Sequence, residues 1–168
     1  GEDYISDRVI RSASLYKKER MDNIIASDWD MDVNPDYIEL AFSNECNFKC
    51  GYCHPNSSSR FMSEIKKFGP YDMVKNHRLD IDWFKAYEEG QNPYVEAWWK
   101  WYPEVVKTLS ILRLTGGEPL MHKSTWRLFE ELHRNPQPHL ELNINTNLGV
   151  KEKFVDNLVG NVNLIREK

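Results

Sequence analysis

The sequence predicts an α/β fold with parallel strands, preceded by a helical segment. Three short β-type runs occur along the 168 residues, at 37–43, 110–115 and 140–144. Helical patterns follow the second and third runs, at 123–134 and 150–168. Strands that alternate with helices pair in parallel through right-handed crossovers. Each run leads into a polar or glycine-rich loop, and α/β folds place their sites at that carboxyl edge of the sheet.

Composition favours a folded protein without a nucleic-acid or membrane partner. Hydrophobic residues make up 40% of the chain, which argues against disorder. The net charge of −4 gives no electrostatic reason to bind nucleic acid or an anionic membrane surface. No apolar run approaches the roughly 20 residues that cross a bilayer, and no signal-peptide pattern is visible. Because the only cysteines are three clustered ones, we expect a reducing compartment and a cytoplasmic protein.

The chain divides into an extension and a core. Residues 1–36 are polar with a weak helical pattern, and we interpret them as a helical and loop extension without chemistry. The core is expected to occupy residues 37–168. Within it, residues 61–109 are long for a strand-to-strand connection and contain two predicted helices, at 80–90 and 94–109. We interpret 61–109 as a helical, aromatic-rich insertion whose tryptophans pack in the core and do not stack nucleic-acid bases.

All three cysteines lie in one stretch, CNFKCGYC at residues 46–53, directly after the first predicted strand. Three thiolates cannot pair off as disulfides, and they do not complete a four-ligand zinc site. They suit a cubane iron–sulfur cluster in which three irons take protein sulfur and the fourth stays open. The alternatives are inert thiols, or a zinc site completed by His54 or His77. A third alternative is c-type haem attachment through C-x-x-C-H, which would require export and would leave Cys46 without a role.

The second and third strands also lead into polar motifs. Gly116-Gly117-Glu118-Pro119 follows the second strand, where glycines allow close backbone approach and a carboxylate can bind an ammonium group. Asn145-Thr146-Asn147 follows the third strand, and its side chains can donate and accept hydrogen bonds toward a carboxylate, ribose or substrate. The alternative for the asparagines is a turn before Gly149.

Taken together, these motifs resemble those of the radical S-adenosylmethionine (radical SAM) enzymes. C-x3-C-x2-C with an aromatic residue before the third cysteine is similar to the family's cluster loop, and a matching Gly-Gly-Glu-Pro ends its next strand. The resemblance implies a partial (β/α)6 TIM-like barrel. Only three of the six strands are placed, so we expect residues 37–168 to form the first half of the core. A longer polypeptide or a partner subunit would supply the rest.

The same resemblance implies cofactors and their ligands. Cys46, Cys50 and Cys53 would hold a [4Fe–4S] cluster, whose open iron is chelated by the amino and carboxylate groups of S-adenosylmethionine. Gly117 and Glu118 would hold the amino end of that cofactor, and the Tyr52 backbone would lie near its adenine. The full set of implied cofactor-binding residues is Tyr52, Gly116, Gly117, Glu118, Asn145 and Asn147.

The implied activity is radical initiation. One electron, from a donor such as flavodoxin or ferredoxin, would cleave S-adenosylmethionine and yield a 5′-deoxyadenosyl radical that takes hydrogen from a substrate. The motif at 145–147 and the serines after Cys53 resemble those of twitch or SPASM-type members, so a peptide or protein side chain is the expected substrate. The alternatives are a non-catalytic zinc- or iron–sulfur-binding structural module and a radical SAM relative that serves only as a scaffold.

Overall fold

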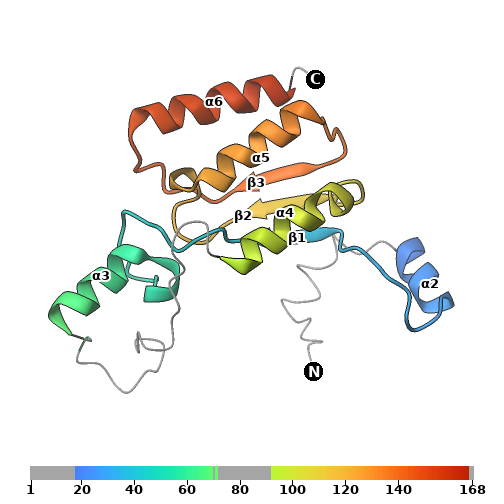
Figure 1. Ribbon diagram of the computed structural model, residues 1–168, viewed down its shortest axis with the longest axis horizontal. Coiled ribbons are helices and arrows are strands. Elements are labelled where there is room, and N and C mark those ends of the chain that lie inside the picture. Colours follow the sequence, from blue (N-terminus) through green and yellow to red (C-terminus); the bar gives the residue numbers. More distant parts are fainter. Residues whose placement is uncertain (1–17, 70, 72–91, 167–168) are drawn as a thin grey trace, which may run out of the picture.

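The computed structural model describes residues 18–69, 71 and 92–166, apart from the side chains of Asn56 and Arg166 (Figure 1). The helix predicted at 80–90 and His77 lie outside the described residues, as does the first half of the N-terminal extension. Helix α2 (Lys18–Ala26) occupies the second half of that extension and buries no side chain. Arg20 in α2 forms an ion pair with Asp36, immediately before the first strand.

The three predicted strands form one parallel sheet in the order β1-β2-β3. Their bounds are Tyr37–Leu40, Ile111–Leu114 and Glu141–Ile144. Strand β1 ends three residues before the predicted Ser43. Beyond Leu40 its neighbour is a glycine turn, and single hydrogen bonds replace the strand ladder there: Thr115 N donates to Leu40 O (2.9 Å) and Gly117 N to Ser43 O (3.1 Å).

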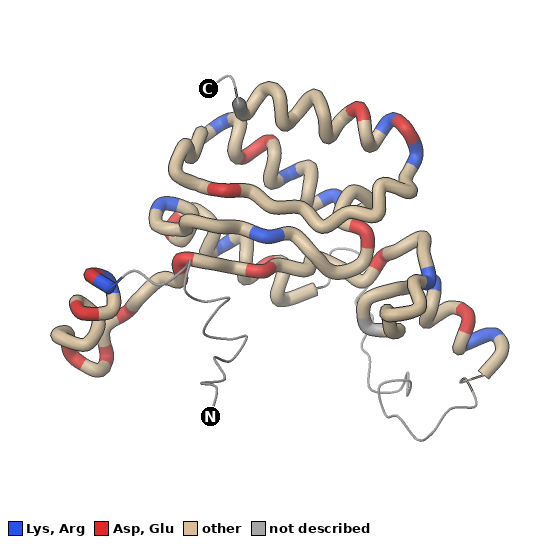
Figure 2. The backbone as a smooth tube through the Cα atoms, turned by 180° about the vertical axis from the view of Figure 1, so that it is seen from behind, with Lys and Arg blue, Asp and Glu red and all other residues tan. Residues whose placement is uncertain are grey.

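Helices cover one face of this sheet. Helix α4 (Pro93–Val105) precedes β2, α5 (Lys123–Arg134) lies between β2 and β3, and α6 (Glu152–Arg166) follows β3 beside α5. Figure 1 shows α4 and α5 in front of the strands. Figure 2, seen from behind, shows the strands with no described helix across them. The sheet is therefore covered on one face only by the part of the chain that the structure describes.

The covered face carries the apolar half of each strand. Leu112 and Leu114 are almost completely buried, and they pack with Trp98 and Tyr102 of α4 and Leu128 of α5. The prediction that the tryptophan-rich segment packs in the core is confirmed for Trp98, which is 4% exposed. Trp101, one turn further along α4 and in edge-on contact with the Trp98 ring (centroids 6.4 Å), is 41% exposed.

The open face carries the polar half. Glu39, Arg113 and Asn143 stand side by side across the three strands. Glu39 accepts hydrogen bonds from Thr115 Oγ1 (3.2 Å) and from the Tyr37 hydroxyl (3.3 Å). Parallel sheets are normally buried on both faces. In the described part of the chain this polar face stays open, and the Arg113 and Glu39 side chains on it are 41% and 51% exposed.

One described helix was not predicted. Helix α3 (Ser59–Phe68) follows the short 3-10 turn η1 (Pro55–Ser57) and buries Met62 and Ile65. Its first turn is capped by Ser58, whose Oγ accepts the Phe61 N–H (3.2 Å) and donates to Phe48 O (2.7 Å).

Candidate functional site

The loops that follow the three strands meet at the carboxyl edge of the sheet. The loop after β1 joins the glycine turn after β2, because Ser43 O accepts from Gly117 N (3.1 Å) and Glu45 O from Glu118 N (2.6 Å). It joins the loop after β3 through Asn47 Nδ2, which donates to Gly149 O (2.6 Å). The three motifs, which lie at residues 46–53, 116–119 and 145–147, therefore form one hydrogen-bonded unit.

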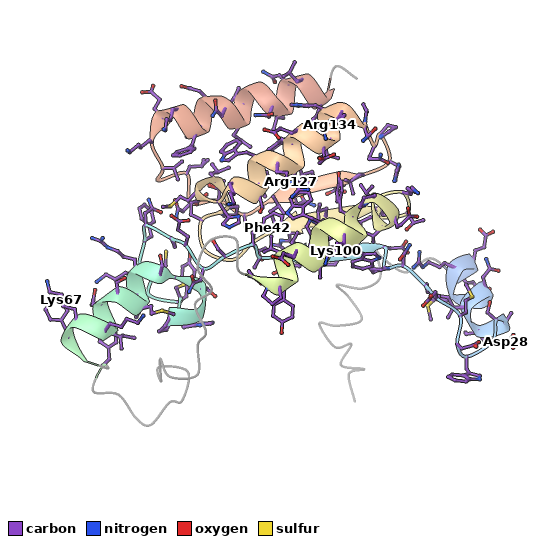
Figure 3. The ribbon with its side chains drawn as sticks, in the orientation of Figure 1. Asp28, Phe42, Lys67, Lys100, Arg127 and Arg134 are labelled. Atoms are coloured by element: carbon purple, nitrogen blue, oxygen red, sulfur yellow. The ribbon has the colours of Figure 1, made fainter. Side chains whose placement is uncertain are left out.

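An aromatic stack fixes the chain where it enters this unit. Phe42 is buried between Trp99 of α4 and His122, with ring centroids 6.0 and 5.7 Å away and nearly parallel planes. The guanidinium carbon of Arg127 lies 4.0 Å from the centroid of the Trp99 ring (Figure 3). Offset stacking and cation–π contact each add to area burial. The start of the cysteine loop is thus anchored to α4 and α5.

The three cysteines are free thiols, each half-buried. Cys46 Sγ accepts N–H groups from Phe48 (3.4 Å) and from the Asn147 side chain (3.8 Å). Burial, followed by the charges of Cys46 and Cys50, raises the pKa of the Cys53 thiol, and a hydrogen bond with the His54 backbone opposes this. The thiols are therefore close enough to influence one another electrostatically.

Tyr52 lies on the solvent-exposed side of the three cysteines and is influenced by their charges. Its side chain is 92% exposed, and a hydrogen bond with Cys50 raises its pKa, with smaller contributions from the charges of all three cysteines. Its exposed position leaves the cluster loop open to a bound molecule.

The donor set fits a multi-iron cluster better than a single ion. Among the described residues, no three His, Cys, Asp or Glu side chains converge to hold one metal ion, so the cysteines and His54 do not form a ready zinc site. In a cubane cluster each thiolate binds a different iron, and no shared point is needed. His54 Nδ1 is buried and has no hydrogen-bond partner among the described residues, which leaves an orphaned polar atom beside Cys53.

The two glycines of the turn are required by backbone crowding. Gly116 has φ +99°, and a Cβ there would lie 2.7 Å from Ser43 O. A Cβ at Gly117 would lie only 2.1 Å from Glu45 O. From the sequence, these glycines are expected to let a ligand approach the backbone closely. The structure shows that they first admit the backbone of the loop that leads to Cys46.

Glu118 is the most deeply buried charged residue of the site, at 2% exposed. Its Oε1 accepts from Leu120 N (3.0 Å) and Thr146 Oγ1 (2.7 Å), and its Oε2 accepts from Asn147 N (2.7 Å). The ion pairs of the described residues include none from lysine or arginine to this carboxylate. Buried charges are normally paired, and a carboxylate offers about four acceptor sites. Glu118 therefore has capacity for one more donor.

The two asparagines after β3 have different surroundings. Asn147 reaches the cysteine loop, where its Nδ2 contacts Cys46 Sγ and Asn47 Oδ1 (3.1 Å). Asn145 Oδ1 instead accepts from Arg113 Nε (3.3 Å), away from the cysteines. Sequence reasoning missed Asn47 as the partner of Asn147, because its only local signal is a polar residue between two cysteines.

An all-parallel sheet with a cysteine loop, a glycine turn and a buried carboxylate at its carboxyl edge defines an α/β cofactor-binding domain. Residues 40–165 match the family described as the Radical SAM superfamily, and the chain belongs to this family. Membership confirms the predicted class of enzyme and its cofactors, a [4Fe–4S] cluster and S-adenosylmethionine. The α/β fold with parallel strands agrees with part of that family's barrel.

Curated relatives share part of this chain. It is 31% identical to the GTP 3′,8-cyclase of Nautilia profundicola over 112 residues, which cover 67% of this chain and 27% of the relative. It is 27% identical to the GTP 3′,8-cyclase of Helicobacter pylori over 124 residues, covering 73% and 30%. The chain thus spans less than a third of their length. These names give GTP and no peptide, so the expected peptide or protein substrate finds no support in them.

No solved structure matches the chain. Across the described residues, no helix is both long and apolar enough to span a bilayer.

Proposed function

We propose that this chain is the cofactor-binding part of an enzyme that cleaves S-adenosylmethionine reductively to start radical chemistry. Residues 37–168 would form the first half of the core, and residues 1–36 an extension. The observation that carries the proposal is Glu118, a buried carboxylate that has no cationic partner among the described residues and is hydrogen-bonded to the loops on either side of it. When bound, the cluster and the cofactor would supply one-electron reductive cleavage of the carbon–sulfur bond of S-adenosylmethionine, which would yield methionine and a 5′-deoxyadenosyl radical.

The residues of the candidate site have different roles in this proposal. Cys46, Cys50 and Cys53 hold the cluster. Glu118 accepts the ammonium group of the cofactor, which compensates its buried charge. The glycine turn keeps this carboxylate within one hydrogen-bonded unit with the cysteine loop, so cluster and cofactor are held in a fixed relation.

The exposed aromatic side chains of the cluster loop suggest where an electron donor docks. Phe48 is 43% exposed and Tyr52 is 92% exposed, on the same loop as the three thiols. A one-electron carrier such as flavodoxin or ferredoxin would approach the cluster from this side. The Tyr52 backbone would then also border the adenine of the cofactor.

The test is anaerobic reconstitution with iron and sulfide, followed by measurement of S-adenosylmethionine binding and of 5′-deoxyadenosine release under reductant. Glu118→Gln should keep the cluster but bind the cofactor at least about tenfold more weakly, because a charge-assisted hydrogen bond contributes about 1.5–3 kcal/mol. Glu104→Gln is the matched control, since Glu104 is exposed on α4 and pairs only with Lys107.

Thermal unfolding of both variants should be recorded, because Glu118 also holds Thr146 and Asn147. A folded Glu118→Gln variant with wild-type cofactor affinity would show that the carboxylate is only structural. No deoxyadenosine from wild-type protein with a complete cluster would favour the non-catalytic scaffold.

A purine nucleotide is the substrate class we would test first. The relatives above are named for GTP, and Arg113 places a guanidinium on the open face of the sheet. A hydrogen bond with Tyr37 raises the pKa of Arg113, so it stays charged at every working pH. Of its five N–H donors, Nε is engaged with Asn145 and another is engaged with Tyr37, while Nη1 lies 4.0 Å from Glu39 Oε2. The remaining donors are available to a phosphate.

GTP should therefore stimulate 5′-deoxyadenosine release by the reconstituted protein, and Arg113→Ala should reduce that stimulation about tenfold, as expected for one charge-assisted contact. Arg134→Ala is the control, because Arg134 lies on α5 and pairs with Glu131. Equal rates with and without GTP would remove the nucleotide hypothesis and leave the cleavage of S-adenosylmethionine unaffected.

A further inference from the structure

The side chain of Asn147 links the loop after β3 to the first cysteine of the cluster loop. Its Oδ1 accepts the Gly149 N–H (2.7 Å), and this contact fixes the orientation of the carboxamide. The amide nitrogen must then face the other way, toward Asn47 Oδ1 (3.1 Å) and Cys46 Sγ (3.8 Å). The carboxamide is thus committed to the cysteine loop.

The backbone of Asn147 is held as firmly as its side chain. Its N–H donates to Glu118 Oε2 (2.7 Å), and Glu118 is buried. On the other side of the link, Asn47 Nδ2 donates to Gly149 O (2.6 Å). The Phe48 ring packs directly against Gly149, where an added Cβ would lie 2.3 Å from Phe48 Cζ. Hydrogen bonds in both directions therefore connect the cysteine loop to the loop after β3.

Cys46 differs from the other two cysteines in this respect. Among the described hydrogen bonds, its sulfur accepts two N–H groups, those of Phe48 and Asn147. The Cys53 thiol instead donates to His54 O (3.7 Å). Hydrogen bonds to cluster sulfurs stabilise the more negative, reduced state and are one of the factors that set the reduction potential.

We propose that Asn147 is a positioning residue that holds the Cys46 sulfur and raises the reduction potential of the cluster by donating its side-chain N–H to that sulfur. This inference rests on the proposed function and makes Asn147 a partner of the cluster's thiolate ligand rather than a contact of S-adenosylmethionine. Asn147 also connects Glu118, the carboxylate proposed to bind the cofactor, to Cys46. Its backbone N–H donates to Glu118 and its side chain donates to the Cys46 sulfur.

The test is the midpoint potential of the reconstituted cluster, measured by an anaerobic redox titration that is followed by electron paramagnetic resonance. Asn147→Leu keeps the size of the side chain and removes both donors. At a fixed potential, its ratio of reduced to oxidised cluster should fall about tenfold, a shift of about 59 mV to lower potential for a one-electron couple. Asn147→Asp keeps the acceptor for Gly149 N–H but puts a negative charge beside the sulfur, so its potential should fall further.

Asn161→Leu is the matched control. It removes an amide that lies on α6 and donates to Asn157 O, so its potential should equal that of the wild type. If both Asn147 variants fail to assemble a cluster while their thermal unfolding and the control variant match the wild type, this would support the role of Asn147 in positioning the Cys46 sulfur. A wild-type potential in both variants would overturn the inference.

The outcomes separate this inference from the proposed function. Wild-type protein that binds the cluster and cleaves S-adenosylmethionine, with potentials unchanged in both Asn147 variants, would reject only the role of Asn147. Wild-type protein that assembles no cluster would reject both.

Discussion

Cys50→Ala should lose nearly all cluster iron and, with it, S-adenosylmethionine cleavage. Wild-type protein should bind about four irons per chain after anaerobic reconstitution, by the stoichiometry of a cubane cluster. Cys50 is half-buried in the turn in which Cys53 N donates to Cys50 O (2.9 Å), and no other cysteine exists to replace it. Removing an outer-shell partner of a metal ligand commonly costs 10–100-fold, so the loss of a ligand itself should lower deoxyadenosine release by at least about 100-fold.

Tyr52→Phe is the matched control within the same loop. It keeps all three thiols and removes only the exposed hydroxyl and its hydrogen bond with Cys50, so the iron content should stay close to the wild-type level. Iron content, sulfide content and the visible absorption of the cluster should be measured together, with far-ultraviolet circular dichroism to confirm folding. Stoichiometric zinc in the wild type, without iron–sulfur absorption, would contradict the prediction and favour the zinc-binding structural module.

Gly117→Ala should destabilise the protein and displace the cysteine loop. The added Cβ would lie 2.1 Å from Glu45 O and 2.6 Å from Glu45 C, and these are backbone atoms that cannot rotate away. Relief requires moving the segment held by Gly117 N to Ser43 O and by Glu118 N to Glu45 O. Overpacking and the loss of two backbone hydrogen bonds together predict a fall of about 2–5 kcal/mol in the free energy of unfolding.

Urea denaturation measures this change, and iron content after reconstitution measures the displacement of the loop. Gly160→Ala is the control substitution, because a Cβ at Gly160 meets nothing within 4 Å and the residue lies inside α6. Alanine should stabilise that helix by about 0.5–1 kcal/mol. A Gly117→Ala variant with wild-type stability and iron content would show that the turn does not constrain the cysteine loop.

Local sequence patterns predicted many of the strands and helices correctly. The three β-type runs are short and alternate in polarity, and each became a strand of the sheet, because alternation with period two is a property of neighbouring residues. Helix α5 begins and ends at the predicted residues, 123 and 134, for the same reason. Helix α3 was missed, although Phe61, Met62, Ile65 and Phe68 have helical spacing behind the Ser58 cap, because the polar run before it indicated a loop.

For the site, too, local sequence showed which chemical groups are present but not which of them are in contact. Residue type and spacing within eight positions were enough to indicate an iron–sulfur cluster and the family, since the chemistry of three thiolates does not depend on the rest of the chain. The surroundings of each side chain were not readable in this way. Glu118 meets Thr146 and Asn147, 28 and 29 residues away, and Asn147 meets Cys46 across 101 residues.

By itself, therefore, the sequence determined the class of protein, the order of strands and helices, and the three cysteines that define the cluster loop. Only the tertiary structure decided that the glycines of the turn are needed for contact with the cysteine loop, that Asn145 faces Arg113, and that Asn147 faces a cysteine sulfur. The physical reason is that a motif specifies which groups a segment offers. Long-range packing of the parallel strands then decides which of those groups meet at the carboxyl edge of the sheet.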